Sequence, residues 1–486
     1  MTFALIALLI SWEIGWFALA ILWPRTGEQA SDVILRVALA GGLGFAISSV
    51  LYLACLVAGV AQRPWVVGVE VAALIALATL ARRIPPPDET GAVESPDSDS
   101  RFDWLLRGGV LVALIVNANA WWVRFKDEPL GFWDAFAIWN LKARFFFVDS
   151  GEHWQRAFSN SVSWSHTDYP LLLPLNVARL WTYAGEPTQE VSVVLSVIFA
   201  LLVAALLYGV VSCLADAALG TLAVYAVLAT PALMAQSTWQ VADIPLAFFL
   251  AAAAGLVLVA DKIPAGERPA LVVSGLFAGA AAWTKNEGLL FALAIPIAMM
   301  FVGSRSEFSA RIQRTGQFAK GLAVPVAILF LMKVTLAGEN DLAGDFAFNS
   351  LTRVFEIDRH AEILASFARA LATLCGLPLL VGLATLAVWL RLRRGDEANR
   401  NIAAITAALL LQLGGYYFIY LITERDLAWH LGTSNLRLFV QLWPTALLLL
   451  FVGLRSFGKA GYELGIIGLR IPANQPPSAT NSDPVE

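Results

Sequence analysis

Apolar stretches long enough to cross a lipid bilayer recur along the whole chain, and they constrain its fold more than any other feature. Examples lie at residues 3–23, 33–60, 104–123, 191–214 and 402–422. A helix needs ~20 apolar residues to span the hydrocarbon core, and this many long apolar helices cannot all be interior helices of a water-soluble domain. The sequence therefore predicts an all-α, polytopic integral membrane protein.

Charge content supports this fold class and excludes one class of partner. Of the 486 residues, 58% are apolar and only 14% are charged, whereas about a quarter of the residues in a soluble domain are charged. The formal charge of −4 leaves no basic surface. We therefore expect membrane lipids, and no nucleic acid, as partners.

Hydropathy and the distribution of basic residues predict the topology. When the N-terminus is placed outside, alternate loops carry most of the arginine and lysine residues and fall on the cytoplasmic side. The C-terminus is then cytoplasmic as well. The predicted spans, about thirteen in number, lie at residues 3–23, 33–60, 64–81, 104–124, 188–214, 217–235, 243–260, 269–284, 288–303, 319–337, 362–390, 402–422 and 437–454.

Two further apolar segments do not fit a span. Residues 169–184 are short, contain two prolines and carry Arg179 in their middle. Counting them as a span would invert every later loop against the charge rule. Residues 132–148 mix aromatic with charged side chains. We expect both segments to form juxtamembrane helices at, or dipping into, the outer interface.

Ionisable residues in or beside a membrane are costly to bury, so each is a candidate functional residue. On this topology most of them lie at the outer ends of spans, whereas a transporter usually places them near the midplane. Glu13, Glu70 and Lys333 are isolated midplane candidates. The outer set consists of Asp134, residues 166–170, Gln240, Asp243, residues 285–287, Asp426, His430, Ser434, Asn435 and Arg437.

Carboxylates, lysine and arginine on one face suit the transfer of a group from a phosphorylated lipid. Asp134 can act as general base on a hydroxyl, because desolvation raises the proton affinity of a carboxylate. Lys285 and Arg437 can hold and neutralise a phosphate leaving group. Each residue also has a structural alternative. Asp134 could cap a helix or pair with Lys142, Lys285 and Arg437 could form ion pairs, and Asp243 could be a helix N-cap.

Four short motifs in this order resemble the polyprenyl-phosphate-dependent GT-C glycosyltransferases. This group includes protein O-mannosyltransferases and the bacterial aminoarabinose and lipopolysaccharide-core sugar transferases, and the similarity spans residues 104–455. The motifs are Trp133-Asp134, HTDYPLLLP at 166–174, ADIPL at 242–246 and LGTSNLRLFVQLWP at 431–444.

The resemblance implies a GT-C-like bundle in the bacterial inner membrane, with an active site on the periplasmic side. A sugar would pass, with inversion, from an undecaprenyl- or dolichyl-phosphate carrier to a hydroxyl of a lipid or glycan acceptor of the cell envelope. Asp134 matches the acidic residue that serves as catalytic base or organises the acceptor. Lys285 and Arg437 are placed at the donor phosphate by their sidedness. The substrate-binding candidates are His166, Asp168, Tyr169, Asp243, Glu287 and His430.

Two departures from the family pattern shape the remaining expectations. The usual pair of adjacent acids is Asp134-Ala135 here, so we expect no metal cofactor. About three spans precede the similar region. The expected organisation is an accessory transmembrane module at 1–84, a disordered cytoplasmic linker at 85–103, the catalytic transmembrane domain at 104–455 and a cytoplasmic tail at 456–486.

Three alternatives stay open at this point. A transporter or flippase of lipid-linked sugars would also use basic residues and interfacial aromatic helices. An O-antigen ligase or polymerase would use a diphosphate-linked donor, for which residues 338–361 supply few basic residues. A purely structural membrane protein would not explain the polar outer face.

Overall fold

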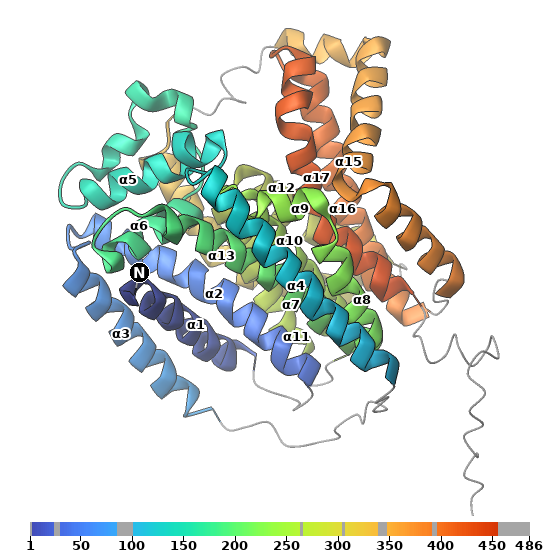
Figure 1. Ribbon diagram of the computed structural model, residues 1–486, viewed down its shortest axis with the longest axis horizontal. Helices are drawn as coiled ribbons and strands as arrows, with labels where there is room; N and C mark the ends of the chain where they lie inside the picture. The colour runs from blue at the N-terminus through green and yellow to red at the C-terminus, as the bar shows by residue number, and fades with distance from the viewer. Residues whose placement is uncertain are drawn as a thin grey trace, which may run out of the picture.

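The computed structural model describes residues 2–23, 30–84, 101–262, 266–303, 307–338, 348–390 and 396–454. Within these ranges the chain is built from helices and contains no β-strand (Figure 1). Most of the predicted linker, residues 85–100, and the whole predicted tail, residues 456–486, lie outside the described residues.

In the described part of the chain, ten helices are long and apolar enough to cross a membrane, which confirms the all-α, polytopic fold class. They are α1 (Thr2–Leu22), α2 (Ala30–Val57), α3 (Arg63–Ala81), α4 (Arg101–Asp127), α7 (Gln189–Leu214), α10 (Asp243–Ala260), α13 (Phe308–Thr335), α15 (Ile357–Leu390), α16 (Asp396–Ile422) and α17 (Leu427–Gly453).

The other three predicted spans also coincide with helices, but these helices are shorter or less apolar. They are α8 (Ala217–Leu228) followed by α9 (Pro231–Gln236), α11 (Glu267–Thr284) and α12 (Asn286–Phe301). The segment predicted as one span at 217–235 is broken because Thr230 adopts an extended backbone and Pro231 starts a new helix. Length and hydropathy alone therefore do not identify these three elements as spans.

Short helices fill the long connection between α4 and α7. They are the π-helix η1 (Ala135–Trp139), α5 (Asn140–Val148), the 3₁₀ turns η2 (Trp154–Phe158) and η3 (Asn160–Ser165), and α6 (Leu172–Ala184). With 13 residues, α6 is too short to span a bilayer. Every residue from Leu172 to Tyr183 is nevertheless buried, so α6 is enclosed by neighbouring helices and does not lie on an open surface.

The first three helices belong to the same hydrophobic core as the rest of the bundle. One cluster of buried side chains runs from Ala4 to Leu454. Helices α1 and α2 approach so closely that a Cβ atom at Gly15 would lie 1.9 Å from the Ala40 carbonyl oxygen. On α3, Glu70 pairs with the fully buried Arg179 of α6. The role of residues 1–84 as an accessory module stays a prediction, but these helices are not a separate structural unit.

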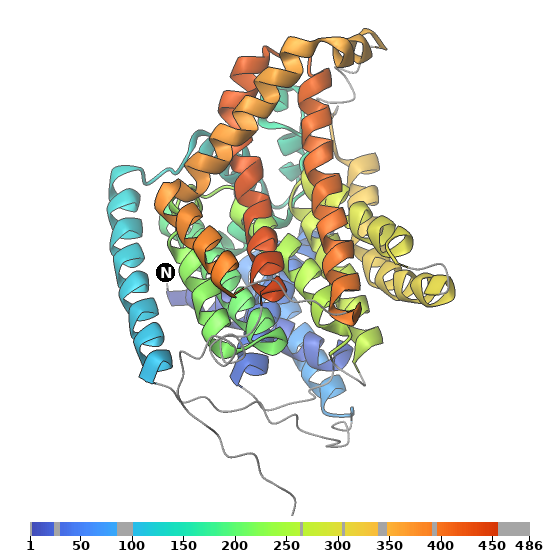
Figure 2. The ribbon, with the colours of Figure 1, turned by 90° about the vertical axis from the view of Figure 1, so that its right-hand side faces the viewer.

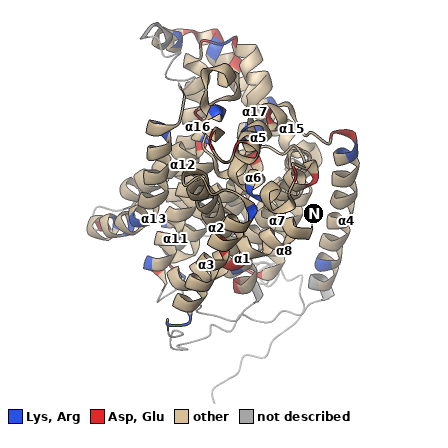
Figure 3. Cartoon of the chain, turned by 90° about the vertical axis from the view of Figure 1, so that its left-hand side faces the viewer, with Lys and Arg blue, Asp and Glu red and all other residues tan. Residues whose placement is uncertain are grey.

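Charged residues concentrate toward the two ends of the bundle, whereas the long faces of the helices are largely uncharged (Figure 3). At the edge of the bundle stands α4, whose exposed side chains include Trp104, Leu111 and Ile115 (Figure 2). At one end α15, α16 and α17 extend beyond the other helices, and α15 bends where Gly376 adopts a φ of 69°. The end that carries these extensions also carries the candidate site.

Candidate functional site

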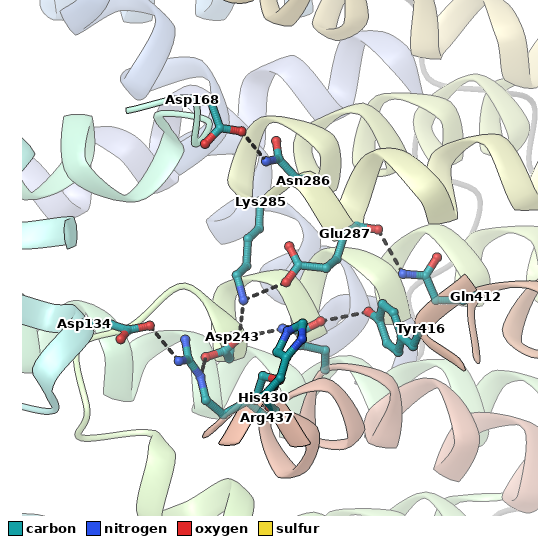
Figure 4. Close-up of polar contacts among 12 residues, drawn as sticks. Asp134, Asp168, Asp243, Lys285, Asn286, Glu287, Gln412, Tyr416, His430 and Arg437 are labelled. Carbon is teal, nitrogen blue, oxygen red and sulfur yellow. Dashed lines mark hydrogen bonds and ion pairs between the residues drawn. The ribbon is translucent and has the colours of Figure 1, made fainter. Parts of the chain in front are cut away.

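The structure gathers seven of the predicted outer residues into two adjacent sets of hydrogen bonds and ion pairs, one around Asp243 and one around Asp168 (Figure 4). The two sets meet at the consecutive residues 285–287, and together we call them the polar network. It contains Asp134, Asp168, Asp243, Lys285, Asn286, Glu287, Lys333, Arg437 and Gln441. Its side chains come from the N-terminal ends of α10 and α12, the C-terminal end of α13, the middle of α17 and the connection between α4 and α7.

Asp243 is the centre of the network and is fully buried. Its Oδ1 atom accepts hydrogen bonds from Lys285 Nζ at 3.0 Å and from Gln441 Nε2 at 2.5 Å, and its Oδ2 atom accepts one from Arg437 Nε at 2.8 Å. Asp243 is the first residue of α10, and the N-cap position before it is Ala242. The structure thus contradicts the N-cap alternative, and Asp243 orients the two cations.

Arg437 joins Asp243 to Asp134, the predicted catalytic base. One Nη1 atom of Arg437 lies 2.6 Å from Asp134 Oδ2, so a single guanidinium group bridges two carboxylates. The Asp134 side chain keeps 15% of its surface exposed, whereas that of Asp243 has none. Asp134 is thus the more accessible carboxylate of the bridge.

Lys285 lies in a sharp turn between α11 and α12 and contacts a second carboxylate, Glu287 Oε1, at 2.8 Å. The turn is tight because Gly288 packs against α11. A Cβ atom there would lie 2.0 Å from the Ala281 carbonyl oxygen. Lys285 has an extended backbone, which directs its side chain away from both helix axes and toward Asp243.

A second part of the network surrounds Asp168. Asn286 donates a hydrogen bond of 2.8 Å to Asp168 Oδ2. Lys333 Nζ donates to the Asp168 backbone oxygen at 2.5 Å and to Asn286 Oδ1 at 2.8 Å. Lys333, an isolated midplane candidate from the sequence, therefore belongs to this site because it lies near the C-terminal end of α13.

The segment that carries Asp134 is fixed to the segment that precedes α10. The Phe132 and Trp239 rings stack at 4.5 Å, and the Phe132 amide donates to the Trp239 carbonyl. Gln240, which has a positive φ of 58°, bonds the Pro129 carbonyl and the side chain of Asn140. These contacts hold Asp134 beside the start of α10. The π-helix η1 follows Asp134 directly, and π-helices are frequent at functional sites.

Lys142 does not pair with Asp134, contrary to that structural alternative. Its Nζ atom donates to the Ser165 carbonyl at 3.1 Å and to the His166 carbonyl, both in the turn that precedes Asp168. The pKa of Lys142 is lowered to about 7, mainly by burial; the carboxylate of Asp168 opposes this shift, and the positive charge of Lys333 adds to it. Asp134 makes no side-chain cap either.

Tyr169 lies between two aromatic rings, with Trp139 at 5.5 Å and His166 at 4.6 Å. Burial raises the pKa of the Tyr169 hydroxyl, and the nearby carboxylate of Glu287 raises it further. Tyr169 therefore stays protonated and can donate a hydrogen bond. His166 contributes its ring to this stack and its carbonyl to Lys142, and its backbone is left-handed, with a φ of 54°.

His430 lies outside the polar network, as do the predicted residues His166 and Tyr169, but unlike them it is not close in the sequence to a member of the network. It lies seven residues before Arg437 on α17, about 10 Å along the helix axis. Its ring contacts Thr423 at 3.0 Å and packs against Tyr420. It stands on the part of α17 that extends beyond the bundle. A direct role in the network is therefore not supported, because both partners belong to the end of α16.

Four members or supports of the network were not assigned as site residues from the sequence, although Asn286 was part of the predicted outer set and Lys333 was a midplane candidate. Gln441 lies one helical turn after Arg437 on α17, and Asn286 lies between the two predicted residues Lys285 and Glu287. The spacing i, i+4 could have indicated Gln441, since it places both side chains on one helix face. Lys333 and Lys142 gave no local signal, because their partners are far away in the sequence.

Within the described residues, no group of three or more His, Cys, Asp and Glu side chains is arranged to hold a metal ion. The expectation of a metal-independent site stays a prediction. Comparison of the chain with known protein families, with curated proteins and with solved structures finds no match. The interpretation of the site therefore depends on its own geometry.

Proposed function

We propose that this chain is a GT-C-type membrane glycosyltransferase. It would transfer a sugar from a polyprenyl-phosphate carrier to a hydroxyl group of a lipid or glycan acceptor of the cell envelope. The single observation that carries the proposal is the bridge formed by Arg437. It joins the predicted base Asp134 to Asp243 and, through Asp243, to the second predicted phosphate-binding cation, Lys285.

The burial pattern supports a specific order of events. Asp243 is enclosed and keeps its hold on Arg437, whereas Asp134 is partly exposed and shares the same guanidinium group. A donor phosphate arriving at Arg437 competes with Asp134 for that group, since both are anionic oxygen ligands. Donor binding thus releases the Asp134 carboxylate to the acceptor, and the base becomes available only when the donor is in place.

The chemical step then needs no further acid. Asp134 takes the proton of the acceptor hydroxyl while the oxygen of that hydroxyl attacks the anomeric carbon of the sugar. The bond from that carbon to the phosphate oxygen breaks with inversion, and its electron pair stays on the phosphate. Lys285 and Arg437 stabilise the charge that develops on the leaving phosphate.

We also propose how the chain crosses the membrane. We place thirteen spans, including α8, α11 and α12, in the bacterial inner membrane, with the N-terminus outside and the C-terminus in the cytoplasm. The network is then periplasmic. Its position at the ends of α10, α12 and α13 favours a transferase over an alternating-access flippase, which usually binds its substrate near the midplane.

The test is transfer of radiolabelled sugar from a panel of polyprenyl-phosphate sugars to envelope lipids by purified protein in liposomes, with and without a chelator. Asp134→Asn should lower kcat by about 10²–10⁴-fold, the usual contribution of a general base. It should bind the donor as tightly as wild type or more tightly, because the competing carboxylate is gone.

Asp261→Asn, at the opposite end of α10, is the matched control and should transfer normally. Translocation of lipid-linked sugar without transfer would replace the proposal with the flippase alternative. Loss of transfer in the presence of chelator would overturn the metal-independent mechanism.

A further inference from the structure

The turn at residues 165–169 is held by two lysines that come from different helices. Lys142 of α5 donates to the carbonyls of Ser165 and His166, and Lys333 of α13 donates to the carbonyl of Asp168. Lys142 is fully buried, so it reaches no ligand itself. Its surroundings contain a single carboxylate, Asp168, and a second cation, Lys333.

We propose that Lys142 is a positioning residue whose protonated ammonium group locks the 165–169 turn and makes the site competent to bind an anionic phosphate. The ligand class rests on the proposed function, whereas the locking of the turn does not. Protonated, the ammonium group makes charge-assisted hydrogen bonds to two carbonyls, which are about twice as strong as those of a neutral amine. Deprotonation therefore loosens the turn.

The geometry links this turn to the substrate side. The left-handed conformation of His166 is uncommon for a residue with a side chain, so it persists only where its surroundings fix it. Two residues later Asp168 meets Asn286 and Lys333, and Tyr169 enters its aromatic stack. A loosened turn displaces these two side chains together.

The charges of the polar network also favour a protonated Lys142. The carboxylates of the network are Asp134, Asp168, Asp243 and Glu287. With all of these groups ionised, Lys285, Lys333 and Arg437 leave one negative charge unmatched, and a protonated Lys142, which lies close to Asp168, balances it. A phosphate brings further negative charge into a region of low dielectric, where like charges repel strongly. Binding should therefore favour the protonated form of Lys142.

Few titratable or charged groups face Lys142, so its titration can be distinguished from theirs. They are Asp168, Tyr169 and His166 of the turn and Lys333 of α13. Because the pKa of Lys142 is lowered to about 7, the competent fraction falls as the pH rises above 7. The apparent affinity then falls by about tenfold for each further pH unit.

The experiment measures binding of a polyprenyl monophosphate to purified full-length protein in vesicles from pH 6 to pH 9. Wild-type affinity should fall above pH 7. Lys142→Arg, which stays charged, should show no such fall, and Lys142→Met should bind weakly at every pH. Lys126→Met, at the end of α4, is the control and should follow wild type. A wild-type affinity that stays constant from pH 7 to pH 9 would overturn the proposal.

Amide hydrogen exchange of residues 163–171, in wild-type protein and in Lys142→Met, tests the lock without any ligand. Protection, expressed relative to an unstructured reference peptide at each pH, should decrease above pH 7. If no polyprenyl phosphate binds at any pH, the proposed donor is wrong, and a pH-dependent protection of this turn still establishes the role of Lys142. Protection that is unchanged by pH and by Lys142→Met would contradict that role.

Discussion

An arginine bridges two carboxylates at each end of the helical bundle, and the two bridges differ mainly in burial. At one end Arg437 joins Asp134 and Asp243. At the other end Arg314 joins Asp261 and Glu267, which connect the end of α10 to the start of α11. The carboxylates are 15% and 0% exposed in the first bridge, and 29% and 41% exposed in the second.

This difference separates a structural ion pair from a candidate site. The bridge at Arg314 connects helix ends and is partly exposed, and solvated ion pairs contribute little stability. The bridge at Arg437 takes charged groups out of water, and the desolvation of such groups can exceed their mutual attraction. A network that carries this cost without an evident structural need is a candidate site, which is why the proposed function is placed at that end of the bundle.

The largest expected effect is on transfer, and it tests whether the two bridges differ in function. Arg437→Gln removes one of two cations at the proposed phosphate site, so the rate of transfer should fall by about 10²–10³-fold. Arg437→Lys keeps the charge but cannot bridge two carboxylates, and should restore only part of the rate. Arg314→Gln should transfer at a rate close to wild type. Equal losses in Arg437→Gln and Arg314→Gln would remove the functional distinction.

A smaller effect is expected on stability, and it tests the difference in burial. Asp243→Asn leaves two buried cations with one carboxylate fewer, so we expect it to lower the free energy of unfolding by about 3 kcal/mol. Asp261→Asn should lower it by less than about 1 kcal/mol, because its partners are partly solvated. Thermal unfolding in detergent, followed by helix content, measures both. Similar unfolding midpoints for the two variants would show that burial does not make the ion pairs of the polar network more sensitive to the loss of a carboxylate.

Much of the fold was predictable because membrane helices have a simple periodic signal. All but one of the predicted spans coincide with a single helix, since apolar length is the main signal of such elements. The break between α8 and α9 was missed because the segment is apolar on both sides of Pro231. The enclosure of α6 was missed because its partner for Arg179 is Glu70, more than a hundred residues earlier.

The candidate site was predictable to a smaller extent. Sidedness placed Asp134, Asp243, Lys285 and Arg437 on one face, and the structure shows them in contact. Sidedness does not specify depth or partner, however. Sidedness therefore included His430, which lies on α17 about 10 Å along the helix axis from Arg437. It also left Lys333 unexplained, because its position near the end of α13 cannot be deduced from sidedness.

The smallest effect sharpens the comparison through ionic strength. Mobile ions screen charges over about 10 Å at 0.1 M salt and about 3 Å at 1 M, but they reach solvated charges far better than buried ones. The destabilisation caused by Asp261→Asn should therefore vanish when salt is raised to about 1 M, whereas that caused by Asp243→Asn should persist. Unfolding midpoints of both variants and wild type across a salt series provide the measurement. If the destabilisation caused by Asp243→Asn also disappeared at high salt, mobile ions would have to enter the network freely. In a site so open to water, competition between the donor phosphate and Asp134 for Arg437 could not by itself release Asp134.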